Sequence, residues 1–321
     1  MGWEAHPTGI MKYLYFIFSI LLVFASLFVG QIDIDIANLF NTQSIDYKVL
    51  MELRLPRTIG AFLAGGILAL GGMLFQSIFR NALASPYTLG VASGASFGVG
   101  IAVLLGLTSM SYLFGFVGAI STVLIHLAFS MRVKYYDKDS MLLIGIAMSF
   151  FYSAMLMVLL YLGNLKESYE IVRFTMGSLD IVSSDLWAMG FSAVVIVAIT
   201  RLYKRDIQLM LISYDYALLK GVNIAKSSYI LLTIVSVAIG VVVTIVGPIG
   251  FVGLIIPHII KQIYKQSSDK LVFEIFFYGG IFLVLCDMLS RILHSGANIP
   301  IGVVTSIIGV PIFIYLIIKR S

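Results

Sequence analysis

The chain has 321 residues, of which 60% are hydrophobic and 12% charged, with a mean hydropathy of +1.03 and a net charge of +5. Charged residues make up about a quarter of an ordinary soluble domain, so this composition excludes a soluble globule and predicts an integral membrane protein. The single cysteine, Cys286, also excludes a framework of disulfides.

Long apolar runs bounded by charge, proline or glycine predict an all-α, polytopic bundle of ten transmembrane helices. The first run, Tyr13 to Gly30, follows a weakly charged start and lacks a clear cleavage site, so we expect a retained span rather than a signal peptide. The ten spans are expected near residues 13–30, 57–78, 88–107, 112–131, 141–162, 184–202, 229–246, 249–264, 272–292 and 301–318.

The basic residues predict how these spans are oriented. An even number of spans puts both termini on one side, and fifteen of the 21 lysines and arginines, Arg132 and Lys134 among them, fall in segments on that side. By the positive-inside rule the N- and C-termini are cytoplasmic. The net charge of +5 then reflects anchoring at lipid headgroups and requires no nucleic acid.

Cations and glycines mark the first spans. Arg54-Leu-Pro-Arg57 places two cations at the outer end of span 57–78, against an acidic background. Gly90, Gly94 and Gly98 recur at every fourth position of the next span, a pattern typical of close helix packing. Packing explains these glycines, and a substrate pathway among them would be an additional inference.

The longest inner connection, about residues 203–228, is half apolar but too interrupted to span the membrane. Ser213 can cap a short helix, Asp215 suits its first turn and Gly221 its end. We expect a short amphipathic helix on the cytoplasmic face. It either contacts a partner or binds only lipid, and local sequence favours neither.

Few ionisable groups lie inside the spans. Asp287 precedes Arg291 by one helical turn, which predicts a local ion pair, and His126 and His258 are best explained as hydrogen-bonded structural residues. A chain of buried carboxylates is missing, which argues against a proton- or sodium-driven carrier. Discontinuous helices could still coordinate an ion through backbone carbonyls.

The chain also lacks a nucleotide-binding loop of its own. The nearest approach to the phosphate-binding pattern, before Lys226-Ser227, has Lys220 and Ala225 where glycines are required. Any ATP hydrolysis must therefore belong to a separate subunit.

Three separated motifs resemble the permease subunits of ABC importers for iron-siderophores, haem and cobalamin. The first runs from Arg54-Leu-Pro-Arg57 through Gln76 to Leu89-Gly90-Val-Ala-Ser-Gly94. The others are Gly247-Pro-Ile-Gly-Phe-Val-Gly-Leu-Ile-Ile-Pro257-His258 and Ile299-Pro300-Ile-Gly-Val-Val-Thr-Ser-Ile-Ile-Gly-Val-Pro311. The resemblance covers nearly the whole chain in order. One departure is Asn81-Ala82-Leu-Ala-Ser85-Pro86, which lacks a proline and a carboxylate of the family pattern.

The resemblance implies a single permease domain over residues 1–321 that has no catalysis, cofactor or metal of its own. It implies a second permease copy or a paralogue around a central pathway, two cytoplasmic ATPase subunits that hold ATP and Mg²⁺, and an external substrate-binding protein. It assigns binding-protein docking to Arg54, Arg57 and Arg291. It assigns contact with the ATPase to Ser213, Tyr214, Asp215, Ala217 and Gly221. It assigns pathway or packing positions to Gln76, Gly90, Gly94, Gly98, Gly247, Pro248 and Pro300.

The expected activity is ATP-driven import by alternating access at the cytoplasmic membrane. A ferric siderophore is the first expectation for the cargo, and haem, cobalamin and molybdate are the alternatives. An ion-coupled secondary transporter and a membrane scaffold are rival classes.

Overall fold

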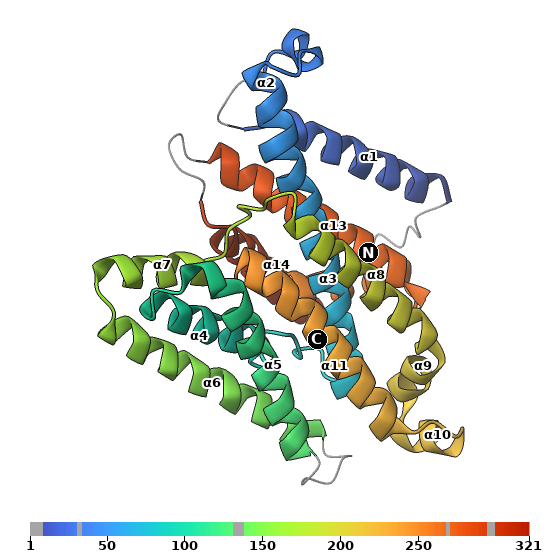
Figure 1. The fold of residues 1–321 in the computed structure, drawn as a ribbon. Coiled ribbons are helices and arrows are strands. Elements are labelled where there is room, and N and C mark those ends of the chain that lie inside the picture. The colour runs from blue at the N-terminus through green and yellow to red at the C-terminus, as the bar shows by residue number, and fades with distance from the viewer. Residues whose placement is uncertain (1–8, 31–33, 131–137, 268–269, 294–298, 321) are drawn as a thin grey trace.

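The computed structural model describes residues 9–30, 34–130, 138–267, 270–293 and 299–320. Every regular element in these ranges is a helix, so the predicted all-α membrane fold is confirmed (Figure 1). Arg132 and Lys134, counted above among the cytoplasmic charges, lie outside the described residues.

Ten apolar helices correspond to the ten predicted spans. Within the described residues, six are long and apolar enough to cross a membrane: Ile45–Phe79, Thr108–His126, Leu142–Leu162, Asp185–Leu202, Ile224–Val246 and Val272–Ile292. Four apolar helices are shorter, with described stretches Phe16–Phe28, Val91–Leu104, Val252–Tyr264 and Ile301–Leu316. In chain order the ten are α1 (Gly9–Phe28), α3 (Leu55–Phe79), α4 (Val91–Leu104), α5 (Ser111–Ser130), α6 (Lys138–Leu162), α8 (Asp185–Leu202), α11 (Ile224–Val246), α12 (Val252–Tyr264), α13 (Val272–Ile292) and α14 (Ile301–Arg320).

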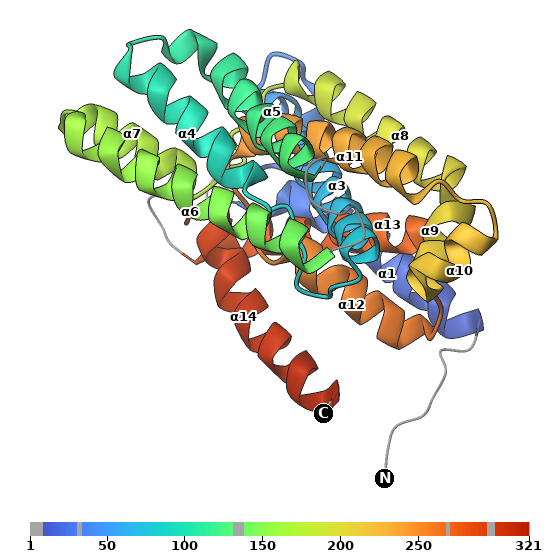
Figure 2. The same ribbon diagram turned by 90° about the horizontal axis from the view of Figure 1, so that it is seen from below.

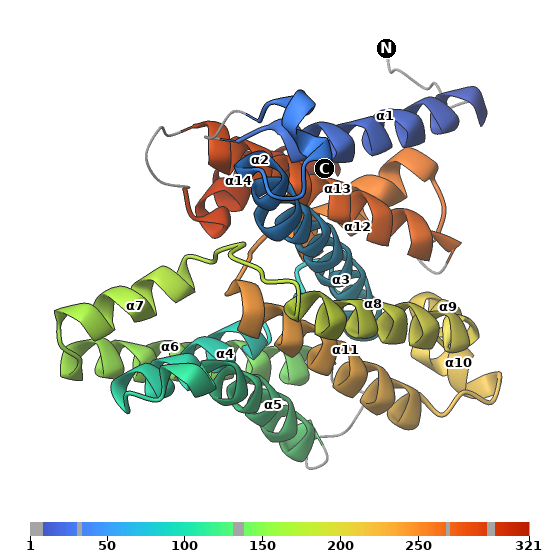
Figure 3. The ribbon, with the colours of Figure 1, turned by 45° about the horizontal axis from the view of Figure 1, so that its top comes forward.

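Helix α3 forms the central axis of the molecule (Figure 3). It continues outward through a π-helical turn, Val49–Arg54, into α2 (Ile45–Lys48), so one helical rod of 35 residues is about 50 Å long. Pro56 has no N–H, so it cannot donate the helical hydrogen bond to the carbonyl four residues earlier. The π turn lies where this bond is missing. The rod is thin because glycines face its neighbours: a Cβ on Gly65 would lie 2.2 Å from the carbonyl oxygen of Gly279 in α13.

Helices α8, α11, α12 and α13 pack directly against α3. Helices α4 and α5 pack against the far side of α11, and α14 packs against α12 and α13 (Figures 2 and 3). Helices α4 and α5 cross closely, because Gly94 and Gly98 bring the two backbones together. A Cβ on Gly94 would lie 2.6 Å from the carbonyl oxygen of Gly118, and one on Gly98 would lie 2.1 Å from that of Phe114.

Two of the predicted spans are shorter than expected. Helix α4 has 14 residues and α12 has 13, so each covers only about 20 Å of a hydrocarbon core of about 30 Å. Left-handed backbone conformations at Gly90 (φ 80°) and Phe251 (φ 67°) start these helices late. Segments 81–90 and 247–251, which precede these helices, are non-helical. Inside a membrane, backbone of this kind is tolerated only where it is buried in protein or lines a cavity.

Several helices outside the spans were not predicted. Helix α7 (Leu165–Thr175) lies on the outer side and begins with a capping box between Asn164 and Glu167. On the inner side α9 (Lys204–Ile212) follows α8 directly and is succeeded by α10 (Tyr214–Leu219). Only α10 corresponds to the surface helix expected from the sequence.

Candidate functional site

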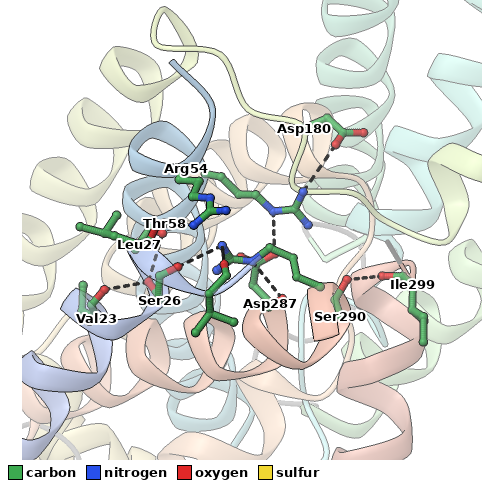
Figure 4. Close-up of polar contacts among 12 residues, drawn as sticks. Val23, Ser26, Leu27, Arg54, Thr58, Asp180, Asp287, Ser290 and Ile299 are labelled. Atoms are coloured by element: carbon green, nitrogen blue, oxygen red, sulfur yellow. Dashed lines mark hydrogen bonds and ion pairs between the residues drawn. The ribbon is translucent and has the colours of Figure 1, made fainter. Parts of the chain in front are cut away.

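An ion cluster joins α3 to α13 at the outer end of the bundle (Figure 4). Asp287, which is 0% exposed, accepts a 2.8 Å hydrogen bond from Nε of Arg57. Its second oxygen lies 2.9 Å from Nη2 of Arg291, so the predicted pair between Asp287 and Arg291 is present. This second contact is an ion pair without hydrogen-bond alignment, and the bond from Arg57 is the better aligned of the two.

Arg54 and Arg291 also hold the end of α1. Nη1 of Arg54 donates to the carbonyl of Leu27 at 3.0 Å, and Nη1 of Arg291 donates to the carbonyls of Ser26 and Val29 at 3.0 and 2.7 Å. The last carbonyls of a helix have no partner within it and form the negative end of its dipole, so two guanidinium groups stabilise this terminus. Arg54 and Arg291 are each only 6% exposed.

The cluster holds more positive than negative charge. Arg57 and Arg291 share the carboxylate of Asp287, which is fully buried, so these three side chains carry one positive charge in excess. Asp180 reaches within 4.0 Å of Arg57, but it is half exposed and already paired with Arg173 at 2.9 Å. The described ion pairs at the outer end of α3 therefore contain one more guanidinium group than carboxylates.

A cavity of about 460 Å³ lies beside the two non-helical segments. Its walls come from segment 85–88, the end of α7, the segment 248–254 and the first turns of α14, and they include Tyr87, Pro248, Phe251 and Ser306. Gly247 and Pro300 lie next to it in the chain. Backbone and hydroxyl groups supply its polar surface, and charged side chains are missing among the described residues that line it.

A backbone junction supports the outer wall of this cavity. Ser178 N donates to Val246 O at 2.8 Å, which ties the segment after α7 to the end of α11. Ile301 N and Gly302 N, in the first turn of α14, donate to Gly177 O and Met176 O at 3.2 and 3.0 Å. Close approach requires glycine here, because a Cβ on Gly247 (φ 72°) would lie 2.4 Å from a carbonyl of α7.

The side chain of Gln76 replaces a hydrogen-bond donor that α12 lacks because of a proline. Pro257 lies inside this helix and has no N–H, so the carbonyl four residues earlier, on Gly253, loses its helical donor. Nε2 of Gln76 donates to this carbonyl at 3.0 Å and is itself buried. A Cβ on Gly72, one turn before Gln76, would lie 2.0 Å from the same oxygen, so glycine is needed for the approach.

The inner end of α3 is attached to α9 and α10. Arg80, in a left-handed conformation (φ 48°), donates to the carbonyl of Ile212 at 3.3 Å and stacks over the ring of Tyr214 at 5.7 Å. The Tyr214 hydroxyl donates in turn to the carbonyl of Ile78. Burial raises the pKa of this hydroxyl, partly offset by Arg80, so it remains a donor. Arg80 and Ile78 were not predicted to serve as contacts of this kind.

The inner helix has the expected bounds but not the expected cap. Ser213 occupies the position before α10, yet its side chain makes no capping hydrogen bond, so that part of the prediction is wrong. Asp215 lies in the first turn and is exposed, while Ala217 is fully buried. Gly221 ends the helix in a left-handed conformation (φ 80°). Leu219 is 84% exposed, and an exposed leucine at this position was not predicted.

Comparisons with known proteins agree with one another. A model of the FecCD transport family matches residues 17–319. The chain is 30% identical to the hemin transport system permease protein HmuU of Yersinia pestis, over 100% of this chain and 98% of the relative. It is 28% identical to the vitamin B12 import system permease protein BtuC of Vibrio vulnificus, over 94% and 92% of the two chains. It is also similar to a metal-chelate type ABC transporter solved in an inward-facing conformation, with 26% identity, a TM-score of 0.86 and coverage of 96% and 99%.

Proposed function

The chain belongs to the FecCD transport family, and from this membership we propose that it moves a metal chelate, with an iron-siderophore as the first candidate, across the cytoplasmic membrane. Members are multi-pass permease subunits of ABC importers, so the chain is not itself catalytic and works with an ATPase and a binding protein. We infer two permease subunits around one pathway, as two copies or as paralogues, in contact with membrane lipid. Two ATPase subunits bind ATP and Mg²⁺.

The cavity beside the two non-helical segments carries this proposal. Moving cargo needs an opening beside the helices, and an open cavity of about 460 Å³ lies where the short helices α4 and α12 begin. Tyr87 and Phe251 belong to this cavity, and both precede the helices that begin there. Alternating access would widen it first toward one side and then toward the other.

The lining favours a chelate over a bare oxyanion. Burying a compact anion such as molybdate requires compensating charge, and the described lining residues carry none. An organic chelator encloses the charge of its metal, so a polar and aromatic wall suffices. Among chelates, haem and cobalamin remain the alternatives, since relatives carry the names of hemin and vitamin B12 systems.

Uptake by the reconstituted importer tests the cargo. Proteoliposomes containing this chain and its ATPase are supplied with the binding protein loaded with a radiolabelled ferric siderophore, haem, cobalamin or molybdate. We expect ATP-dependent accumulation of the siderophore alone. Preferred accumulation of another cargo refutes the siderophore, and accumulation that follows an imposed ion gradient without ATP favours the secondary transporter.

We propose that the binding protein docks at the outer arginine cluster. The excess positive charge supports this, because an incoming carboxylate would compensate guanidinium groups that Asp287 alone does not. Arg57 is the best placed, since its side chain retains 14% exposure. Arg54 and Arg291 can take part only if they release their bonds to the end of α1, and docking could thereby shift α1.

Binding measurements on Arg57→Gln test this docking site. The matched control is Lys166→Gln, because Lys166 is an outer cation whose side chain is 85% exposed and whose one close carboxylate is that of Glu170. We expect Arg57→Gln to weaken binding of the binding protein, and Lys166→Gln to leave it unchanged. Equal affinities for both variants would place docking elsewhere.

We propose that α10 is the surface that meets the ATPase. Its outward residues combine the carboxylate of Asp215 with Leu218 and Leu219, which are 43% and 84% exposed. A partner surface with an apolar pocket and a basic rim fits this pattern. Ser213, Ala217 and Gly221 would act by setting the position of the helix, and Tyr214 by linking it to α3. Leu219→Ser should weaken co-purification of the ATPase, whereas unchanged co-purification argues against α10 as the contact.

A further inference from the structure

The side chain of Ser227 joins two helices. It lies in the first turn of α11, is 4% exposed, and donates a hydrogen bond to the carboxylate of Asp206 in α9. Buried hydroxyl groups in this bundle commonly donate instead to a carbonyl of their own helix, as do those of Ser77, Ser96, Ser192, Thr200 and Thr244. A hydrogen bond to a carboxylate is roughly twice as strong as one between neutral groups. Ser227 therefore fastens α11 to α9.

Helices α9 and α10 move as one unit, which packs beside the first turns of α11 (Figure 3). Arg205, next to Asp206 in the chain, donates a long hydrogen bond of 3.4 Å to the carbonyl of Lys220, which follows the last residue of α10. Met210 of α9 and Ala217 of α10 are both buried in the same hydrophobic core. A displacement of α10 is therefore shared by α9 and reaches Asp206.

The chain itself joins α10 to α11 through a joint that can bend. Gly221 has a left-handed conformation (φ 80°), and a Cβ added there would meet no atom within 4 Å. On either side of the joint the contacts go to separate helices, because the N–H of Val222 donates back to α10 and the side chain of Asn223 caps α11. The bond between Asp206 and Ser227 bypasses this joint, so it makes α11 follow the unit of α9 and α10.

The outer end of α11 lies at the wall of the large cavity. The helix has 23 residues without a proline, so it is a stiff rod about 35 Å long. The carbonyl of its last residue, Val246, accepts a 2.8 Å hydrogen bond from Ser178 N, and Pro248 lines the cavity of about 460 Å³. A tilt imposed on the inner end of α11 is thereby delivered to the cavity wall.

We propose that Asp206 and Ser227 are positioning residues that transmit the movement of α10 to α11, and through α11 to the wall of the cavity. The inference rests on the proposed function, in which α10 meets the ATPase and cargo passes through the cavity. Neither residue lines the cavity or belongs to α10, so both act through the helix that they hold. Without their bond, α10 keeps its contact with the ATPase but moves without α11.

Uptake per ATP hydrolysed, measured in proteoliposomes that contain the complete importer, tests the pair. Ser227→Ala and Asp206→Ala should each lower this ratio by up to roughly tenfold, the factor that corresponds to one lost hydrogen bond to a charged group. The double variant should be no worse than the more affected single variant, because both changes remove the same bond. Asp206→Asn keeps an acceptor for the serine hydroxyl, so it should recover part of the ratio.

Ser192→Ala is the matched control. Ser192 is also buried, at 6% exposure, and its hydroxyl donates to Ala188 within α8 itself, so the ratio should stay at the wild-type value. If Ser227→Ala and Asp206→Ala lower the melting temperature but keep the wild-type ratio, the bond only supports the fold and the inference is overturned. If the wild type shows no ATP-dependent uptake of any cargo, the proposed function fails and this inference fails with it.

A thiol in the cavity wall reads the transmitted motion directly. The single cysteine of the chain, Cys286, is 1% exposed, so Ser306→Cys adds an accessible thiol to the cavity with little change of volume. We expect its rate of maleimide labelling in the importer to differ between the nucleotide-free and ATP-bound states. Adding Ser227→Ala should abolish that difference, and adding Ser192→Ala should preserve it. A difference that persists in full with Ser227→Ala overturns the inference, as does the lack of any difference while the bond is intact.

Discussion

Arg57 and Asp287 are 230 positions apart in the chain, yet they form a 2.8 Å hydrogen-bonded ion pair inside the outer end of the bundle. The pair fastens the central helix to α13, and Arg291 then connects α13 to the end of α1. The same three arginines that family resemblance assigns to docking are thus also internal supports. A test of docking must therefore separate contact with the partner from stability of the bundle.

Asp287→Asn should destabilise the protein strongly. It removes the buried counter-charge that Arg57 and Arg291 share, and breaking a buried ion pair costs about 3–5 kcal/mol. Asp180→Asn is the control, because this half-exposed carboxylate contributes only about 0–1 kcal/mol. Thermal unfolding in detergent measures both, and similar melting points for the two variants would contradict the assigned role of Asp287.

Gln76→Leu should destabilise the protein through α12. The carbonyl of Gly253 would lose its replacement donor, and an unpaired buried acceptor costs about 1–3 kcal/mol. Pro257→Ala restores the backbone N–H that donates to this carbonyl in an ordinary helix. Gln76→Leu should therefore lower the free energy of unfolding less in the Pro257→Ala background. A double-mutant cycle of unfolding free energies measures the coupling, and strictly additive effects would show that Gln76 does not substitute for the missing donor.

Tyr214→Phe should uncouple ATP hydrolysis from uptake. The variant keeps the ring beneath Arg80 and loses the bond to Ile78, worth about 1 kcal/mol, so α10 is held less firmly to α3. We expect ATPase activity to persist while uptake per ATP falls. Tyr216→Phe, on the exposed side of the same helix, is the control and should behave as wild type. Loss of the ATPase itself would instead point to failed assembly.

The pH dependence of this contact follows from the raised pKa of Tyr214. A tyrosine whose pKa is higher in the folded state stabilises that state below its ordinary pKa of 10.0 and loses the contribution as pH rises through the raised value. Uptake should therefore show no loss attributable to Tyr214 at any pH below 10.0. A fall in wild-type uptake within that range that is absent in Tyr214→Phe would contradict this.

Gly72→Ala should destabilise the crossing of α3 and α12. The added methyl group would lie 2.0 Å from the carbonyl oxygen of Gly253, and overpacking of this kind costs about 1–3 kcal/mol or more. Gly190→Ala is the matched control, since this helical glycine has open space around it and alanine there gains up to about 1 kcal/mol of helix propensity. Opposite shifts in melting temperature are expected.

Properties that depend on neighbouring residues could be predicted from the sequence. Ten apolar runs correspond to ten apolar helices, because the length needed to cross a bilayer is a local requirement. Asp287 and Arg291 pair because an interval of four residues brings side chains together on any α-helix. The inner surface helix was placed correctly by Asp215 and Gly221, although α9 was missed because the charged run Lys204-Arg205-Asp206 opens it directly after α8.

Tertiary structure alone decided which distant residues meet. The late starts of α4 and α12 depend on left-handed residues held by surrounding backbone, and no hydropathy window registers them. Three contacts form only once α3 packs between its neighbours. Arg57 pairs with Asp287, Gln76 donates to the carbonyl that Pro257 leaves without a donor, and Arg80 stacks on Tyr214. The sequence by itself determined a ten-span permease with cations at its outer end and a short helix at its inner end. Whether those cations face solvent or support the bundle depended on contacts between segments hundreds of residues apart, and only folding creates those contacts.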